Sequence, residues 1–343
     1  MKSKITTLFS ILFILATALP AQNFVSDVSK RGTTAAPFLT IAQGARALGM
    51  GTAFVAVADD QSAMYWNPAG IADLSGYRIV FDYTQWLADV KYNYLGATIN
   101  LGNLGVVGLN MTSSSIPEMR VTTVENPSGT GEMFGVSDAA IGVTYALKLT
   151  DKFAIGFNPK FIYQKIWKMS ASAIAIDIGV KYQTPFDGIT LGMSITNFGS
   201  KMRLLGNNTI VLYDPDPFTS GNNGHIPADA RTDEWTLPLN FKVGIAYNVF
   251  SIDGNRLVLA VDASHPSDNY ESVDVGGEYA FNDFIFLRGG YKSLFLQNAE
   301  ERFTLGFGIQ QALIGSTQLA IDYAYQDYAR LKNVQKFSVG ILF

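Results

Sequence analysis

Few residues of this chain could carry out covalent or metal chemistry. The sequence contains no cysteine and only two histidines, His225 and His265. Disulfides, thiolate catalysis and cysteine-ligated zinc are therefore excluded, and a multi-histidine metal centre is not expected. The sequence also lacks a Gly-x-Ser-x-Gly elbow, a phosphate-binding loop and a His-Glu-x-x-His zinc motif. We expect neither enzymatic activity nor a bound cofactor.

Two pairs of carboxylates could still hold a cation. Asp59 and Asp60 are adjacent, and Asp214 and Asp216 belong to an Asp-Pro-Asp-Pro sequence. Asp59 or Asp60 can instead cap a short helix over residues 63–66. The second pair can remain solvated on its proline-rich turn. We favour these two interpretations, so no metal site is predicted.

A third group of residues lies between positions 36 and 74, in a stretch without regular alternation of apolar and polar residues. The candidates for packing, gating or ligand contact in this stretch are Arg46, Asp59, Asp60, Tyr65, Trp66, Asn67, Pro68 and Gly70. Pro68 ends the short helix, because the residue before a proline is driven out of the helical region. Arg46 could pair with a carboxylate such as Asp262 or Asp322. We favour a packing role over direct gating or ligand contact.

The overall composition narrows the class of protein. The 343 residues carry a net charge of −4, so no basic field attracts nucleic acid. Hydrophobic residues make up 48% of the chain, and 16 Tyr, 23 Phe and 32 Gly favour strands and turns.

The first 21 residues are typical of a secretory signal peptide. Lys2 and Lys4 precede an apolar run over residues 8–19, and Ala18-Leu-Pro-Ala21 supplies small residues for cleavage. The run is too short for a comfortable membrane anchor, and no later stretch is long enough for a transmembrane helix. We expect export through the Sec pathway and cleavage after Ala21.

From residue 77 onward, short segments alternate apolar with small or polar residues, as in Ile174, Ile176 and Ile178. Successive side chains of a strand point to opposite faces, so each segment predicts a strand with one apolar face. About fourteen segments begin near residues 77, 91, 104, 136, 152, 172, 189, 238, 256, 271, 284, 301, 317 and 334. An even count suits a single-chain outer-membrane barrel. The even-numbered connections are short and the odd-numbered ones tend to be longer, with 114–135 and 199–237 the largest, which predicts a periplasmic C-terminus.

The two faces of these strands distinguish a membrane barrel from a soluble sandwich. One face is bulky and apolar. The other carries charges, namely Asp82, Asp138, Lys160, Asp177, Lys181, Lys242, Asp262, Asp274, Glu278, Arg288 and Asp322, together with many glycines. Charges facing water would also suit a sandwich. Glycine fits a crowded lumen better than a sandwich surface, and a closed barrel leaves no strand edge in lipid.

Two sequence elements carry a resemblance to known outer-membrane proteins. The last strand ends on Phe343 with Phe337, Val339 and Ile341 on the same face, which resembles the signal read by outer-membrane assembly machinery. The N-terminal stretch contains Phe38-Leu39, Ala45-Arg46-Ala47, Gly49-Met50-Gly51, Val55-Ala56, Asp59-Asp60 and Tyr65-Trp-Asn-Pro-Ala-Gly70. This ordered set resembles the PorV/PorQ family, which is related to FadL-type channels. Because a barrel follows the set, the resemblance covers essentially the whole mature chain.

The resemblance implies an all-β, transmembrane antiparallel barrel of about fourteen strands, with its N-terminal region folded into the lumen as a plug. We therefore expect a signal peptide over residues 1–21, a plug over 22–76 and a barrel over 77–343.

The resemblance also implies a location in the bacterial outer membrane and leaves two functions open. A role in type IX secretion implies secreted cargo and translocon subunits as partners, with residues 199–237 as the docking surface. A FadL-like role implies transport of a lipophilic ligand, and the apolar loop residues 210–213 would suit one. Outer-membrane lipid is a partner in either case. An open porin is disfavoured because the lumen is expected to be filled.

Overall fold

The computed structural model describes residues 30–343, apart from 222, 297–298 and 314. The expected signal peptide and the first residues of the expected plug lie outside this part of the chain. Residues 31–343 form one compact unit. Within the described residues, no helix is long and apolar enough to cross a membrane.

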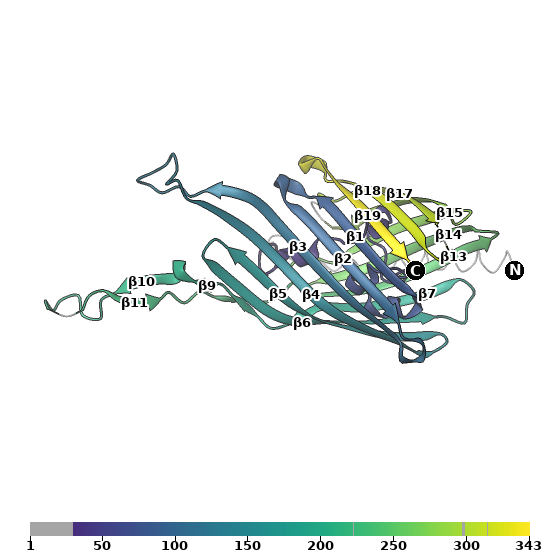
Figure 1. Ribbon diagram of the computed structural model, residues 1–343, viewed down its shortest axis with the longest axis horizontal. Helices are drawn as coiled ribbons and strands as arrows, with labels where there is room; N and C mark the ends of the chain where they lie inside the picture. The colour runs from purple at the N-terminus through teal and green to yellow at the C-terminus, as the bar shows by residue number, and fades with distance from the viewer. Residues whose placement is uncertain (1–29, 222, 297–298, 314) are drawn as a thin grey trace. The chain divides into compact units, whose positions relative to one another are not determined.

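Fourteen long antiparallel strands form one closed barrel (Figure 1). They are β1 (Tyr77–Gln85), β2 (Lys91–Asn100), β3 (Val106–Arg120), β4 (Met133–Thr150), β5 (Phe153–Ile166), β6 (Met169–Gln183), β7 (Ile189–Gly199), β13 (Asn240–Ile252), β14 (Asn255–Pro266), β15 (Ser272–Phe281), β16 (Ile285–Leu294), β17 (Phe303–Ala312), β18 (Gln318–Asp327) and β19 (Asn333–Leu342). Each strand pairs with the next long strand along the chain, and β1 pairs with β19 to close the barrel, with Tyr83 opposite Phe337. The predicted all-β antiparallel barrel and its number of strands are confirmed.

The remaining elements are short. The connection between β7 and β13 contains β8 (Met202–Arg203), β9 (Leu205–Gly206), β10 (Ile210–Tyr213), β11 (Ile226–Asp229) and β12 (Glu234–Trp235). The helical turns are η1 (Pro37–Thr40), α2 (Ala45–Gly49), α3 (Ala63–Trp66), η2 (Pro68–Asp73), η3 (Leu87–Asp89), η4 (Gly102–Leu104), η5 (Asn207–Thr209) and η6 (Ala329–Leu331). In Figure 1, the β10–β11 hairpin extends beyond the end of β6, on the side of the odd-numbered connections.

Two connections differ from the sequence prediction. Strand β3 ends at Arg120 and β4 begins at Met133, so the loop between them is shorter than the predicted 114–135. Most side chains at the far end of β3 are exposed, so alternation is lost there although the backbone still pairs. The connection between β5 and β6 contains only Trp167 and Lys168, so the rule of longer odd-numbered connections fails at this point.

The two faces of the barrel wall follow the predicted parity. On β1, Ile79 and Phe81 are 45% and 47% exposed, whereas Asp82 and Thr84 are fully buried. Seven of the predicted inward charges are buried: Asp82, Asp177, Lys181, Asp262, Asp274, Glu278 and Arg288. The other four, Asp138, Lys160, Lys242 and Asp322, are half-buried. An apolar outer surface around a polar interior is the pattern of a membrane barrel.

The chain ahead of β1 packs against the inward face of the wall. Residues 42–58 are buried almost throughout, and they follow the strands so closely that wall glycines have no room for a side chain. A Cβ on Gly276 would overlap the carbonyl oxygen of Met50, and one on Gly290 would overlap the backbone nitrogen of Gly51. These glycines are needed for close approach of two backbones.

Two neighbouring glycines of β16 provide a matched test of this packing. Gly290→Ala places a methyl group against Gly51, and overpacking of this kind costs about 1–3 kcal/mol of unfolding free energy. Gly289→Ala points to the opposite face, where nothing lies within 4 Å. We expect Gly290→Ala to lower the temperature of the heat-modifiability transition in detergent and to expose residues 42–58 to proteolysis. Equal behaviour of the two variants would contradict the packing.

Candidate functional site

The segment between residues 36 and 74, here called the N-terminal segment, cannot satisfy its own backbone. Its α-helices α2 and α3 have five and four residues, and the first N–H and last C=O groups of a helix have no partner within it. Buried backbone groups without partners are costly. The side chains of the barrel wall supply these partners.

Wall carboxylates and hydroxyls accept hydrogen bonds from N–H groups of this segment. One oxygen of Asp262 on β14 accepts from the backbone nitrogens of Phe54 and Val55, at 2.7 and 2.8 Å. Asp82 on β1 accepts from the backbone nitrogen of Gly44 at 2.9 Å. The sequence singled out these aspartates as inward charges but gave them no such role.

Wall lysines donate hydrogen bonds to carbonyl groups of the same segment. Lys181 Nζ on β6 donates to the carbonyl oxygens of Val57 and Ala58, both at 3.0 Å. Lys336 Nζ on β19 donates to the carbonyl oxygen of Ala42 at 2.6 Å. Charged side chains of β1, β6, β14 and β19 therefore hold the backbone of the segment in place.

Arg46 on α2 is the centre of an ion-paired cluster. Its Nε and one terminal nitrogen donate to the two carboxylate oxygens of Glu278 on β15, at 2.7 and 2.9 Å. This bidentate geometry is the strong form of an arginine–carboxylate pair. Arg46 also donates to Asp59 and, at 3.3 Å, to Asp60.

The predicted partners of Arg46 were wrong. Asp262 accepts from the backbone instead, and Asp322 pairs with Arg288. Arg288 also donates to Glu278 at 2.7 Å. The parity of a strand gives the face on which a carboxylate lies, but not which of several carboxylates on that face an arginine reaches.

The capping prediction for Asp59 and Asp60 was also wrong in its detail. Ser62 is the residue that precedes α3, and its side chain makes no capping bond. Asp60 accepts instead from the backbone nitrogen and hydroxyl of Ser62, one turn ahead of the helix. Burial raises the pKa of Asp60. Burial would also raise the pKa of Asp59, but the Arg46 charge outweighs it and holds that pKa below the ordinary value.

Tyr65 and Trp66 hold the beginning of the segment. Trp66 Nε1 donates to the carbonyl oxygen of Gln43 at 2.9 Å, and the Tyr65 hydroxyl donates to that of Leu39 at 3.0 Å. Their rings meet edge to face with centroids 4.9 Å apart. Both side chains therefore connect α3 to the beginning of the N-terminal segment.

Asn67, Pro68 and Gly70 form the junction between the segment and the wall. Asn67 Nδ2 donates to the carbonyl oxygens of Val55 and, on β6, Val180, at 2.8 and 3.0 Å. Its Oδ1 accepts from the backbone nitrogen of Ala69 and caps η2. Pro68 begins η2, where its missing N–H has no cost. A Cβ on Gly70 would overlap the carbonyl of Ala58.

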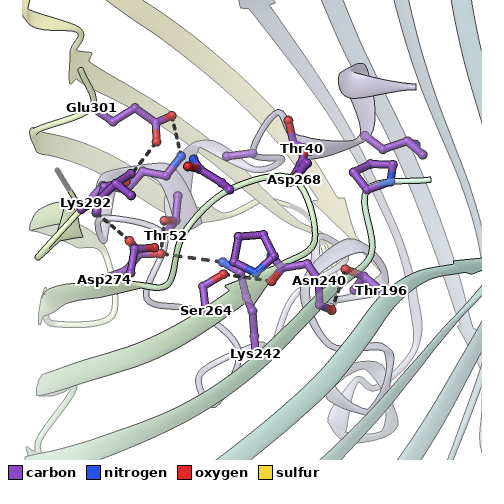
Figure 2. A pocket seen from close by; sticks show the side chains of 18 of the residues that line it. Thr40, Thr52, Thr196, Asn240, Lys242, Ser264, Asp268, Asp274, Lys292 and Glu301 are labelled. Atoms are coloured by element: carbon purple, nitrogen blue, oxygen red, sulfur yellow. Dashed lines mark hydrogen bonds and ion pairs between the residues drawn. The ribbon is translucent and has the colours of Figure 1, made fainter. Parts of the chain in front are cut away.

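Two cavities lie against the N-terminal segment. One, of about 430 Å³, opens among the odd-numbered connections and is lined by Trp66 and Lys242 (Figure 2). The other, of about 260 Å³, is lined by Arg46, Asp59 and Asp60. They share no lining residue among the residues described. Of the predicted candidates, Tyr65 and Trp66 line the first cavity and Arg46, Asp59 and Asp60 the second, whereas Asn67, Pro68 and Gly70 line neither.

The comparisons with known proteins agree on family and fold. The family model of the type IX secretion system protein PorV matches residues 25–205, which is more than half of the chain. No curated protein matches the sequence significantly.

Solved structures that resemble this one are FadL-type barrels. The CymD monoaromatic hydrocarbon channel is 12% identical, with 87% of this chain and 96% of that chain covered and a TM-score of 0.55. The toluene transporter TbuX of Ralstonia pickettii is 12% identical, with 88% and 97% covered and a TM-score of 0.54. A FadL homologue of Pseudomonas aeruginosa is 13% identical, with 88% and 98% covered and a TM-score of 0.51. At such identities the likeness shows the fold alone.

Replacing Arg46 tests whether the ion cluster holds the segment in place. Arg46→Met leaves the buried Glu278 without its bidentate partner, and breaking a buried pair costs about 3–5 kcal/mol. We expect that loss in the unfolding free energy measured by urea titration. Arg46→Lys keeps the charge but not the bidentate geometry, so it recovers part of the loss.

Arg78→Met is the matched control for this measurement. Among the hydrogen bonds described, those of Arg78 go only to Ser75, three residues earlier in the chain. Its replacement is expected to change the unfolding free energy by less than about 1 kcal/mol. Similar losses for Arg46→Met and Arg78→Met would argue against the cluster as the fixing point.

Proposed function

Because the chain belongs to the PorV family of type IX secretion system proteins, we propose that it handles secreted cargo as a component of the type IX translocon. The fold and the family place the protein in the outer membrane. Export through the Sec pathway, guided by residues 1–21, is part of the same proposal. So are the N-terminal segment acting as a plug and the absence of catalytic activity.

The observation that carries this proposal is the apolar hairpin in the longest connection. All four residues of β10, Ile210–Tyr213, are exposed, and Leu212 is 65% exposed. Phe218, in the turn between β10 and β11, is almost completely exposed. Exposed apolar residues grouped in this way usually mark a surface that another molecule covers.

The hairpin also has the backbone geometry for strand addition. β10 pairs only with β11, so its other edge has unpaired N–H and C=O groups among the described residues. An edge strand of this kind is a template for pairing with another chain. A secreted protein that arrives with an exposed strand would find both main-chain and apolar contacts there.

The second candidate function is transport of a hydrophobic small molecule. The likeness to hydrocarbon channels and a cavity open to the loops favour it. The mixed polar and apolar wall of this cavity counts against it, since pockets for such ligands are mainly apolar. So does the N-terminal segment, whose backbone is bonded to strands on several sides of the barrel.

Mild detergent extraction from the native membrane, followed by mass spectrometry of the co-purified molecules, tests the proposal. We expect secreted proteins and translocon subunits at stoichiometric levels with the wild-type protein. The double variant Val211→Asp/Leu212→Asp puts charge on the exposed hairpin and is expected to reduce cargo recovery at least about tenfold, the effect of losing some 1.4 kcal/mol.

Phe186→Asp is the control, because Phe186 is 72% exposed in a short even-numbered turn. Cargo recovery should not change in this variant. A defined lipophile without protein partners, recovered equally from all three proteins, would refute the secretion role and support hydrophobic transport.

A further inference from the structure

The cavity at the loop end contains one ammonium group without a hydrogen-bond acceptor. Lys242 on β13 is 13% exposed, and its Nζ lies 3.7 Å from a carboxylate oxygen of Asp274, beyond hydrogen-bond distance. Its other neighbours are the ring of Trp66, 4.8 Å from Nζ, and the negative charge of Asp262 on β14. No other acceptor among the described residues reaches this nitrogen, and Figure 2 shows the side chain directed into the cavity.

Asp274 forms an ion pair with this cation but no hydrogen bond to it, and both of its oxygens accept hydrogen bonds from other groups. One accepts from the hydroxyl of Thr52 and the other from the backbone nitrogen of Ser293, each at 2.9 Å. An ammonium group that faces a cavity and has no hydrogen-bond acceptor among the described residues keeps its three donors available for a ligand.

The other lysines of the cavity differ from Lys242 in having close partners. Lys160 Nζ lies 2.8 Å from the carboxylate of Asp177 and 2.6 Å from Oδ1 of Asn197. Lys292 Nζ lies 2.7 Å from Glu301. The available donors are therefore concentrated at one place on β13.

Side chains around Lys242 add further polar groups. Asn240, two residues earlier on the same face, uses its Oδ1 to accept from Ser264 at 3.0 Å, and no described acceptor takes its Nδ2 hydrogens. The hydroxyls of Thr196 and Ser272 also line the cavity. These groups can bond to hydroxyls of a ligand as donors or acceptors.

We propose that this cavity binds a small hydroxylated carboxylate, such as a sugar acid, with its carboxylate on Lys242 Nζ and Asn240 Nδ2 and its hydroxyls on the surrounding serine and threonine side chains. The volume of about 430 Å³ falls within the usual range for small-molecule sites, on the order of 300–1,000 Å³. The polar walls of β7, β13, β14 and β15 disfavour a long apolar chain. This binding does not depend on cargo transport, so each proposal can fail without the other.

Isothermal titration calorimetry of the full-length protein in detergent tests the site, with D-glucuronate as the probe. D-glucose carries the hydroxyls without the carboxylate, and hexanoate carries the carboxylate without the hydroxyls. We expect glucuronate to bind at least about tenfold more tightly than either, because only glucuronate supplies both the carboxylate for Lys242 and the hydroxyls for the surrounding side chains.

Variants of Lys242 connect the binding to the proposed group. Lys242→Met should weaken glucuronate binding at least about tenfold, Lys242→Arg should retain most of it, and Lys152→Met, at a short turn of the opposite end, should leave it unchanged. Heat modifiability confirms that each variant is folded. Added salt should weaken binding to the wild-type protein, which tests the charge contact without any substitution.

Three outcomes would overturn the proposal. Absence of glucuronate binding to the wild-type protein rejects the site. Equal binding of glucose shows that the carboxylate contact is wrong, and tighter binding of hexanoate shows that the site selects an apolar carboxylate. Unchanged affinity in folded Lys242→Met assigns any binding to another place.

Discussion

The structure depends on one constraint: an irregular stretch of backbone is buried inside a closed barrel, where its polar groups need protein partners. The wall meets this need with charged side chains that bond to main-chain groups, such as Asp262 with the nitrogens of Phe54 and Val55. Glycines on the same inward face supply the space, as Gly276 does beside Met50. Charge on one face and missing side chains beside it are therefore two parts of one arrangement.

The ion cluster around Glu278 makes this arrangement specific in position. Glu278 accepts from Arg46 of the segment and from Arg256 and Arg288 of the wall. A carboxylate shared by three arginines has its lone pairs occupied, so a shift of α2 would leave buried charge unpaired on both sides. The same Arg46 also binds Asp59. The turn ahead of α3 is thus connected to the wall through α2, and the two short helices are held as one unit.

The sequence predicted the barrel well because one periodicity repeats in every strand. All fourteen strands begin within three residues of the predicted positions. The errors come where that periodicity carries no information. Most side chains at the far end of β3 are exposed on both faces, so the continuation of β3 and of its partner β4 past residue 114 was missed. For the candidate site, the sequence singled out eight residues but not the partner of Arg46. Parity orders residues around one strand, whereas contacts across a lumen depend on strand stagger, which no local pattern contains.

The division of the lumen also determines where binding can occur. The space beside Arg46 is lined by arginines and carboxylates, several of which are paired with one another, as in Arg46–Asp59 and Arg288–Asp322. The space at the loop end contains Lys242 with unused donors, and the same end carries the exposed apolar residues of β10. A small polar ligand and a protein partner would thus bind at the same end of the barrel. The ligand would bind to charged groups inside the barrel, and the protein partner would make apolar and main-chain contacts with the hairpin outside it. Recognition at that end needs no movement of the N-terminal segment, whose backbone is hydrogen-bonded to several strands of the wall.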